Sequence, residues 1–102
     1  MTDKEPITVA VDEDILDLIP HYLENRRKDL EDARRALADG DFETLRVIGH
    51  QMKGSGGGYG MDGLTEVGER LEEVSKGLDA QGVGAWLERL EDYLERVQVV
   101  PE

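Results

Sequence analysis

The sequence predicts an all-α protein, an antiparallel up-down four-helix bundle preceded by a short extra N-terminal helix. Apolar residues recur at the three- and four-residue spacing of amphipathic helices through most of the chain. Glycine and aspartate residues separate these segments, and such short connections favour antiparallel neighbours. No segment shows a clear strand pattern, so we expect no β-strand.

The N-terminal end should be irregular and then helical. Residues 1–11 lack helical periodicity and contain a proline, so we expect an extended lead-in before one bundle domain over residues 12–102. Asp12 is positioned to cap a short helix over residues 13–19. Proline is tolerated in a first helical turn but not inside a helix, so Pro20 should break or kink the chain.

Two long helices should follow. The first extends to about Asp39, where Gly40 can end it and Asp41 can cap the next. The second runs from Phe42 to about Tyr59. The first carries the apolar stripe Leu16, Ile19, Leu23, Leu30, Ala33 and Leu37, interrupted by Arg26, and the second carries Phe42, Leu45, Ile48, Gly49, Met52, Gly56 and Tyr59.

Two more helices complete the predicted bundle. Gly60 should end the second long helix, and Asp62 can cap the third, which ends near Gly77. Asp79 can cap the last helix, and Pro101 follows its end. The stripes are Leu64, Val67, Gly68, Leu71, Val74 and Leu78 in the third helix, and Val83, Trp86, Leu87, Leu90, Leu94 and Val97 in the fourth. We expect Trp86 and Tyr93 to serve packing.

Composition excludes several classes of function. The chain has 102 residues, enough for one domain, and its net charge of −12 disfavours nucleic-acid binding, which needs clustered lysine and arginine. It has no cysteine, so neither disulfides nor thiolate chemistry are possible. No apolar run reaches membrane-span length and no signal peptide is visible. We therefore expect a cytoplasmic monomer that contacts neither membrane nor nucleic acid.

The candidate site lies on the second long helix. His50 and Lys53 are three residues apart and so are neighbours on a helix surface, on the face opposite the apolar stripe. Glycines follow directly, and each costs about 1 kcal/mol relative to alanine inside a helix. Gly54 and Gly57 share the outer face with His50, which suggests that another molecule must come close there. Arg46 lies on the same face.

A carboxylate on the third helix should stand beside this histidine. His50 and Glu72 are both eleven residues from Met61, the expected centre of the turn. In an antiparallel hairpin such positions are level, so Glu72 can accept a hydrogen bond from one ring nitrogen and leave the other free as a nucleophile. Alternatively, Glu72 and Lys53 are solvated surface charges. His21 has no comparable neighbours, and we expect no functional role for it.

Residues 45 to 72 resemble the histidine phosphotransfer (HPt) domain of two-component phosphorelays. The family pattern is His-x-x-Lys-Gly, small residues, a helix-ending glycine and a second helix ending in Leu-Glu or Leu-Gln. The matching residues are His50, Lys53, Gly54, the run Ser55 to Gly58, Gly60 and Leu71-Glu72. The resemblance extends from about Asp12 to Val100, because the flanking helices also fall where the family has them.

The resemblance implies a phosphoryl acceptor at Nε2 of His50, with Glu72 orienting the ring. Lys53 and Arg46 would stabilise the phosphoryl group, and Gly54, Gly57 and Ser55 would form the docking face, although Ser55 lies near the core edge and could instead bond its own helix. Gly49 and Gly68 should allow close helix packing.

The implied partners are response-regulator receiver domains and a hybrid sensor histidine kinase. The receivers would supply Mg²⁺, and the chain itself would have no metal site, no ATP site and no turnover of its own. One alternative is an adaptor of the same fold that carries no phosphate. Another is a small enzyme or nucleotide binder using Gly54 to Gly60, but a P-loop needs its lysine after the last glycine, and Lys53 precedes the first. The initiator Met1 favours a free-standing protein.

Overall fold

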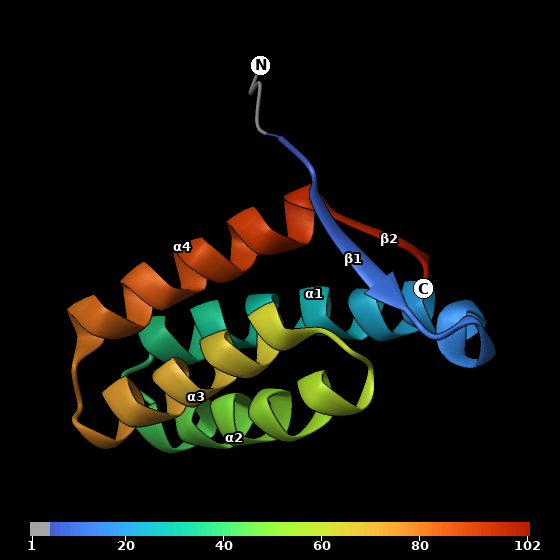
Figure 1. Ribbon diagram of the computed structural model, residues 1–102. Coiled ribbons are helices and arrows are strands. Elements are labelled where there is room, and N and C mark those ends of the chain that lie inside the picture. Colours follow the sequence, from blue (N-terminus) through green and yellow to red (C-terminus); the bar gives the residue numbers. More distant parts are fainter. Residues whose placement is uncertain (1–4) are drawn as a thin grey trace.

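The computed structural model describes residues 5–102, and they fold into four helices beside a two-stranded sheet. In chain order the elements are β1 (Ile7–Val11), the 3₁₀ helix η1 (Glu13–Leu18), α1 (Ile19–Ala38), α2 (Phe42–Gly58), α3 (Asp62–Lys76), α4 (Ala80–Arg96) and β2 (Val97–Pro101). Each helix packs on the next and α4 packs back on α1, so the apolar stripes meet in one core (Figure 1). The predicted mainly helical fold is therefore confirmed.

Aspartate caps begin three of the helical segments as predicted. The side chains of Asp12, Asp41 and Asp79 each accept a hydrogen bond from a backbone N–H two or three residues later. The cap predicted at Asp62 is wrong, because α3 already includes that residue and Met61 is its N-cap. The Met61 side chain is fully buried, so the chain enters α3 directly from a core contact without a side-chain cap.

The turns use backbone conformations with positive φ. Gly40 and Gly60 have φ of 69° and 71°, as expected of glycines that end helices. At the end of α3 the positive φ of 54° falls on exposed Leu78, one residue after the glycine that the sequence offers. Its N–H donates to the carbonyl of Ser75, which holds this turn closed.

The first helical segments follow the prediction in outline. The short helix η1 is of the 3₁₀ type, and α1 begins at Ile19 with Pro20 in its first turn, where the ring is tolerated. Ile19 and Leu23 of the predicted stripe are buried, and Tyr22 adds a buried aromatic side chain that the stripe did not include. The apolar positions therefore place α1 against the other helices.

The prediction that the chain has no strand is wrong. β1 and β2 pair in parallel, with Ile7 opposite Val97 and Val9 opposite Val99, beside the ends of α1 and α4 (Figure 1). These four side chains pack on the core, and Val11 is only 1% exposed. The expected lead-in is thus extended and bound to the bundle over residues 7–11, whereas its residues 1–4 lie outside the described part.

One weak signal for the strands was present in the sequence. Aliphatic β-branched residues recur at every second position, with Ile7, Val9 and Val11 in one segment and Val97 and Val99 in the other. Each segment is five residues long, and its partner lies at the other end of the chain. Helical spacing also placed Val97 in the last helix, although α4 ends at Arg96.

None of the helices between residues 5 and 102 has the length and apolar composition needed to cross a bilayer.

Candidate functional site

The hairpin of α2 and α3 places His50 beside Glu72. The Nδ1 atom of the imidazole lies 3.1 Å from Oε2 of the carboxylate, at hydrogen-bonding distance. The side chain of His50 is 67% exposed, whereas that of Glu72 is only 11% exposed. The contact agrees with the prediction that these two residues are level, since each is eleven residues along the chain from Met61. The ring therefore turns one nitrogen toward a buried acceptor and leaves Nε2 on its other side.

Two lysines surround the carboxylate of Glu72. Nζ of Lys53 lies 3.9 Å from Oε1, and Nζ of Lys76 lies 3.8 Å from Oε2, the oxygen that also bonds His50. Burial raises the pKa of the Glu72 carboxyl, but the hydrogen bond with His50 and the charges of Lys76 and Lys53 outweigh burial and leave the pKa below its ordinary value. Glu72 is therefore held in its ionised form and is not a freely solvated charge.

Lys76 was missed in the sequence, although its position carried a signal. It follows Glu72 by four residues on the same helix, a spacing at which side chains meet. Lys53, which was predicted, also lies 4.0 Å from Oε2 of Glu69, so it is shared between two carboxylates. Glu72 thus contacts His50 and both lysines, and Lys53 links it to Glu69.

Arg46 is turned toward its own helix. Its Nε and Nη2 donate hydrogen bonds of 2.9 and 2.7 Å to the two carboxylate oxygens of Glu43. Glu43 therefore binds the guanidinium of Arg46 through both oxygens, one turn before His50. Arg46 lies on the same face of α2 as His50, but its guanidinium is bonded to Glu43 and is not placed against His50 or Lys53. The carboxylate of Glu72, in contrast, lies against both of these residues.

The glycines of α2 and α3 fall into two groups. A Cβ atom on Gly49 would lie 2.7 Å from the backbone nitrogen of Glu72, and one on Gly68 would collide with the backbone of Lys53. A Cβ on Gly54 would meet nothing within 4 Å, and one on Gly57 would meet only Oγ1 of Thr65, at 4.0 Å. The first group lets the two backbones touch, and the second lies open beside the histidine.

Gly56 belongs with the packing glycines, as its place in the apolar stripe indicated. A Cβ there would lie 2.7 Å from the backbone nitrogen of Thr65 and 3.1 Å from the carbonyl oxygen of Met61. Gly58 is open like Gly54. The glycine run therefore serves packing on one side of α2 and leaves bare backbone on the other.

Ser55 faces α1 instead of the histidine face. Its Oγ lies 2.9 Å from the hydroxyl oxygen of Tyr22, accepts a hydrogen bond of 3.1 Å from Arg26 and contacts the carbonyl of Met52 at 3.5 Å. The ring of Tyr22 stacks on that of Tyr59 with centroids 4.1 Å apart. These contacts tie the glycine-rich end of α2 to α1, a role that the interruption of the α1 stripe by Arg26 hinted at.

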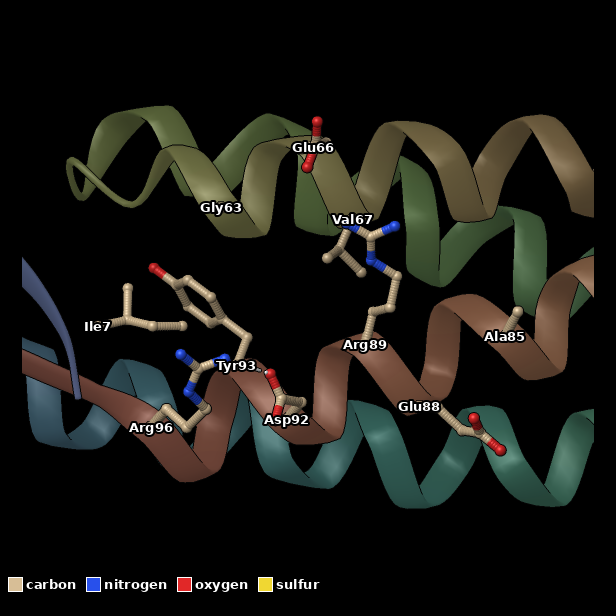
Figure 2. A pocket seen from close by; sticks show the side chains of 10 residues that line it. All are labelled: Ile7, Gly63, Glu66, Val67, Ala85, Glu88, Arg89, Asp92, Tyr93 and Arg96. Atoms are coloured by element: carbon tan, nitrogen blue, oxygen red, sulfur yellow. Dashed lines mark hydrogen bonds and ion pairs between the residues drawn. The ribbon is translucent and has the colours of Figure 1, made fainter. Parts of the chain in front are cut away.

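A separate hollow of about 380 Å³ lies between α3 and α4. Figure 2 shows Tyr93 among the residues that line it, extending from α4 toward α3. A Cβ on Gly63 would collide with the Tyr93 ring. Burial raises the pKa of the Tyr93 hydroxyl, which has no hydrogen-bond partner within residues 5–102. Arg96 and Asp92 pair at 2.9 Å at the rim. None of the predicted site residues lines this hollow.

Metal ligands do not gather anywhere in the described part of the chain. Residues 5–102 contain no group of three or more histidine, cysteine, aspartate or glutamate side chains placed to hold an ion. The groups described at the histidine site are an imidazole, a carboxylate and two ammonium groups.

The described residues form a helical bundle with an exposed histidine on α2. Residues 17–99 match the family model described as the Hpt domain, and the chain therefore belongs to the Hpt domain family. Neither a search of curated proteins nor a search of solved structures finds a match. Membership assigns the chain a phosphotransfer-related role in two-component signalling, in which receiver domains and kinases are the interacting components.

Proposed function

We propose that the protein relays a phosphoryl group through Nε2 of His50 between aspartates of response-regulator receiver domains. The observation that carries the proposal is the bond from Nδ1 to a buried carboxylate, on a ring that is 67% exposed. The proposal includes an up-down antiparallel order of the helices, supported by the three-residue connections between them. It also includes a monomer in the cytoplasm, the compartment in which receivers act.

The transfer step needs only the groups already described. With the proton on Nδ1, the Nε2 lone pair attacks phosphorus of the receiver's aspartyl phosphate, a Nε2–P bond forms and the P–O bond to the aspartate breaks. The electron pair returns to the aspartate carboxylate. The ring becomes positively charged, and the Nδ1 proton stays in its hydrogen bond to Glu72, whose negative charge stabilises the phosphorylated ring.

The remaining residues admit the receiver to His50 and supply positive charge for the phosphoryl group. Lys53 supplies an ammonium for the phosphoryl oxygens, and Arg46 can add a second cation if it leaves Glu43. Gly54 and Gly57 admit the receiver to the ring, with Ser55 supporting that surface from the α1 side. Mg²⁺ is expected on the receiver, which holds the acidic pocket, and the protein is an intermediate without turnover of its own.

The direct test is to mix the protein with a panel of receivers carrying labelled phosphate and Mg²⁺. We expect label to move to this chain from at least one receiver and to return to an unlabelled receiver. The measurement is the label on each protein against time. An adaptor of the same fold would bind receivers and take no label from any of them, and that result would replace the proposal.

A second prediction concerns Glu72. Without an acceptor at Nδ1, imidazole favours a proton on Nε2, which removes the nucleophilic lone pair. Glu72→Ala should therefore shift the His50 tautomer toward Nε2–H in ¹⁵N NMR spectra and slow transfer by about tenfold or more. Glu72→Gln keeps an acceptor without the charge and should lie between the alanine variant and wild type. Equal tautomers and rates in all three proteins would make Glu72 a structural residue only.

A further inference from the structure

We propose that the groove between β2 and the first half of α1 binds an extended, basic segment of another protein, which adds to the sheet as a third strand. The inference does not depend on the relay through His50. The sheet has two strands, so within residues 5–102 the outer edge of each strand has no neighbouring strand. Such an edge presents backbone N–H and C=O groups that can pair with a further strand.

The hydrogen-bond pattern shows which backbone groups of β2 face outward. The N–H of Glu102 donates to the carbonyl of Val11 at 2.9 Å, on the side of β1. Backbone groups point to alternate sides along a strand, so Gln98 and Val100 also face β1, and Val99 turns its N–H and C=O away from it. Within residues 5–102 no backbone hydrogen bond joins Val99 to another element. Val99 therefore offers one donor and one acceptor to a neighbouring strand.

A hollow of about 560 Å³ lies directly beside this edge of β2. Its apolar lining consists of Leu16, Ile19, Pro20 and Leu23 from the helical side and Val97 and Val99 from β2. The two valine side chains are half-buried and share one face of the sheet, because residues two apart on a strand point the same way. A strand added at Val99 would therefore point every second side chain into this apolar hollow.

The charges around the hollow favour a basic partner. Glu24 lines it, and Glu13 lies three residues before Leu16, a spacing that puts two side chains on one face of a 3₁₀ helix. Arg27 is the one cation among the lining residues, and its Nη1 lies 3.6 Å from Oε2 of Glu24. A second copy of the chain, with its net charge of −12, would bring like charges together. The groove therefore fits a segment that alternates apolar residues with lysine or arginine.

The groove is separate from the histidine site. The residues that line it come from η1, α1 and β2, and none belongs to α2 or α3, which carry His50 and Glu72. A partner segment bound in the groove leaves the face around His50 open. Such a partner would be held at a high local concentration beside the bundle while a different surface meets the histidine.

The test uses the full chain and two short capped peptides, one alternating valine with lysine and the other alternating valine with glutamate. The basic peptide should slow hydrogen exchange at the Val99 amide and shift the methyl resonances of Leu16 and Leu23 in NMR spectra. The Val100 amide is the internal control, because it already faces β1 and should change little. The acidic peptide should leave all of these signals unchanged.

Two variants separate backbone pairing from charge. Val99→Pro removes the outward N–H and should weaken binding of the basic peptide about three- to tenfold, the effect of one hydrogen bond. Glu24→Lys should weaken it about two- to fivefold at low salt, as expected of an exposed charge. Asp39→Lys makes the same charge change at an exposed position at the other end of α1 and should bind like wild type. Thermal melting checks that each variant is folded.

Several outcomes would overturn the inference. It is wrong if the basic peptide changes nothing at Val99 or in the groove, or if both peptides bind equally. Protection of the Thr8 and Ala10 amides instead would place the added strand on the outer edge of β1. Protection of Val99 by self-association, seen in sedimentation without peptide, would make the groove a contact between two copies. His50→Gln should bind the peptide like wild type, so failure of the relay and failure of the groove are distinguishable.

Discussion

Replacement of His50 by glutamine should abolish phosphoryl acceptance and leave the fold unchanged. The side chain is 67% exposed and its one described hydrogen bond is to Glu72, so its loss removes little packing. Glutamine has a similar length and can still donate to Glu72, but its amide nitrogen is not a nucleophile. Wild type should carry a label that is labile in acid and stable in base, as expected of a phosphoramidate.

The matched control is His21→Gln, which changes the other histidine, exposed on α1. This variant should accept label at the wild-type rate. The measurements are label incorporation from a phosphorylated receiver, circular dichroism and thermal melting for both variants. Label that persists in His50→Gln and disappears in His21→Gln would move the acceptor to α1.

Most of the fold could be predicted from helical spacing, because the apolar residues of each helix mark the face that the helix buries. In α2 the predicted stripe includes Leu45, Ile48 and Met52, and all three are buried. The sheet could not be predicted in this way, because no local pattern shows which distant segment a strand pairs with. Ile7 and Val97 pair across almost the whole chain, and only the packed bundle brings the two segments together.

The candidate site could likewise be predicted only in part. The position of His50 beside Glu72 followed from counting residues along two helices, because hairpin geometry is regular. The contacts of long side chains did not follow from counting. Arg46 turns to Glu43 and Ser55 turns to Tyr22, since each has several partners within reach and the packed structure selects one. The burial of Glu72 depends equally on how closely α2 approaches α3.

That close approach is made by Gly49 and Gly68, and it supports the prediction with the largest effect on stability. A methyl group at Gly68 would collide with the backbone of Lys53 and lie 2.7 Å from the carbonyl oxygen of Gly49. Backbone atoms cannot move aside as a flexible side chain can. Gly68→Ala and Gly49→Ala should each lower the free energy of unfolding by about 1–3 kcal/mol or more. In a domain of this size each kcal/mol lowers Tm by about 4–8 °C.

Gly54 should behave in the opposite way, because its Cβ would enter open space beside His50. Gly54→Ala should raise the free energy of unfolding by up to about 1 kcal/mol, since alanine favours the helix. Gly54→Leu should melt at or above the wild-type temperature and yet bind receivers weakly and transfer slowly, because its side chain obstructs the approach to the ring. Thermal melting, receiver affinity and transfer rate are measured for all four variants. Transfer by Gly54→Leu at the wild-type rate would show that receivers approach His50 from another side, since the open backbone at Gly54 would then serve no docking.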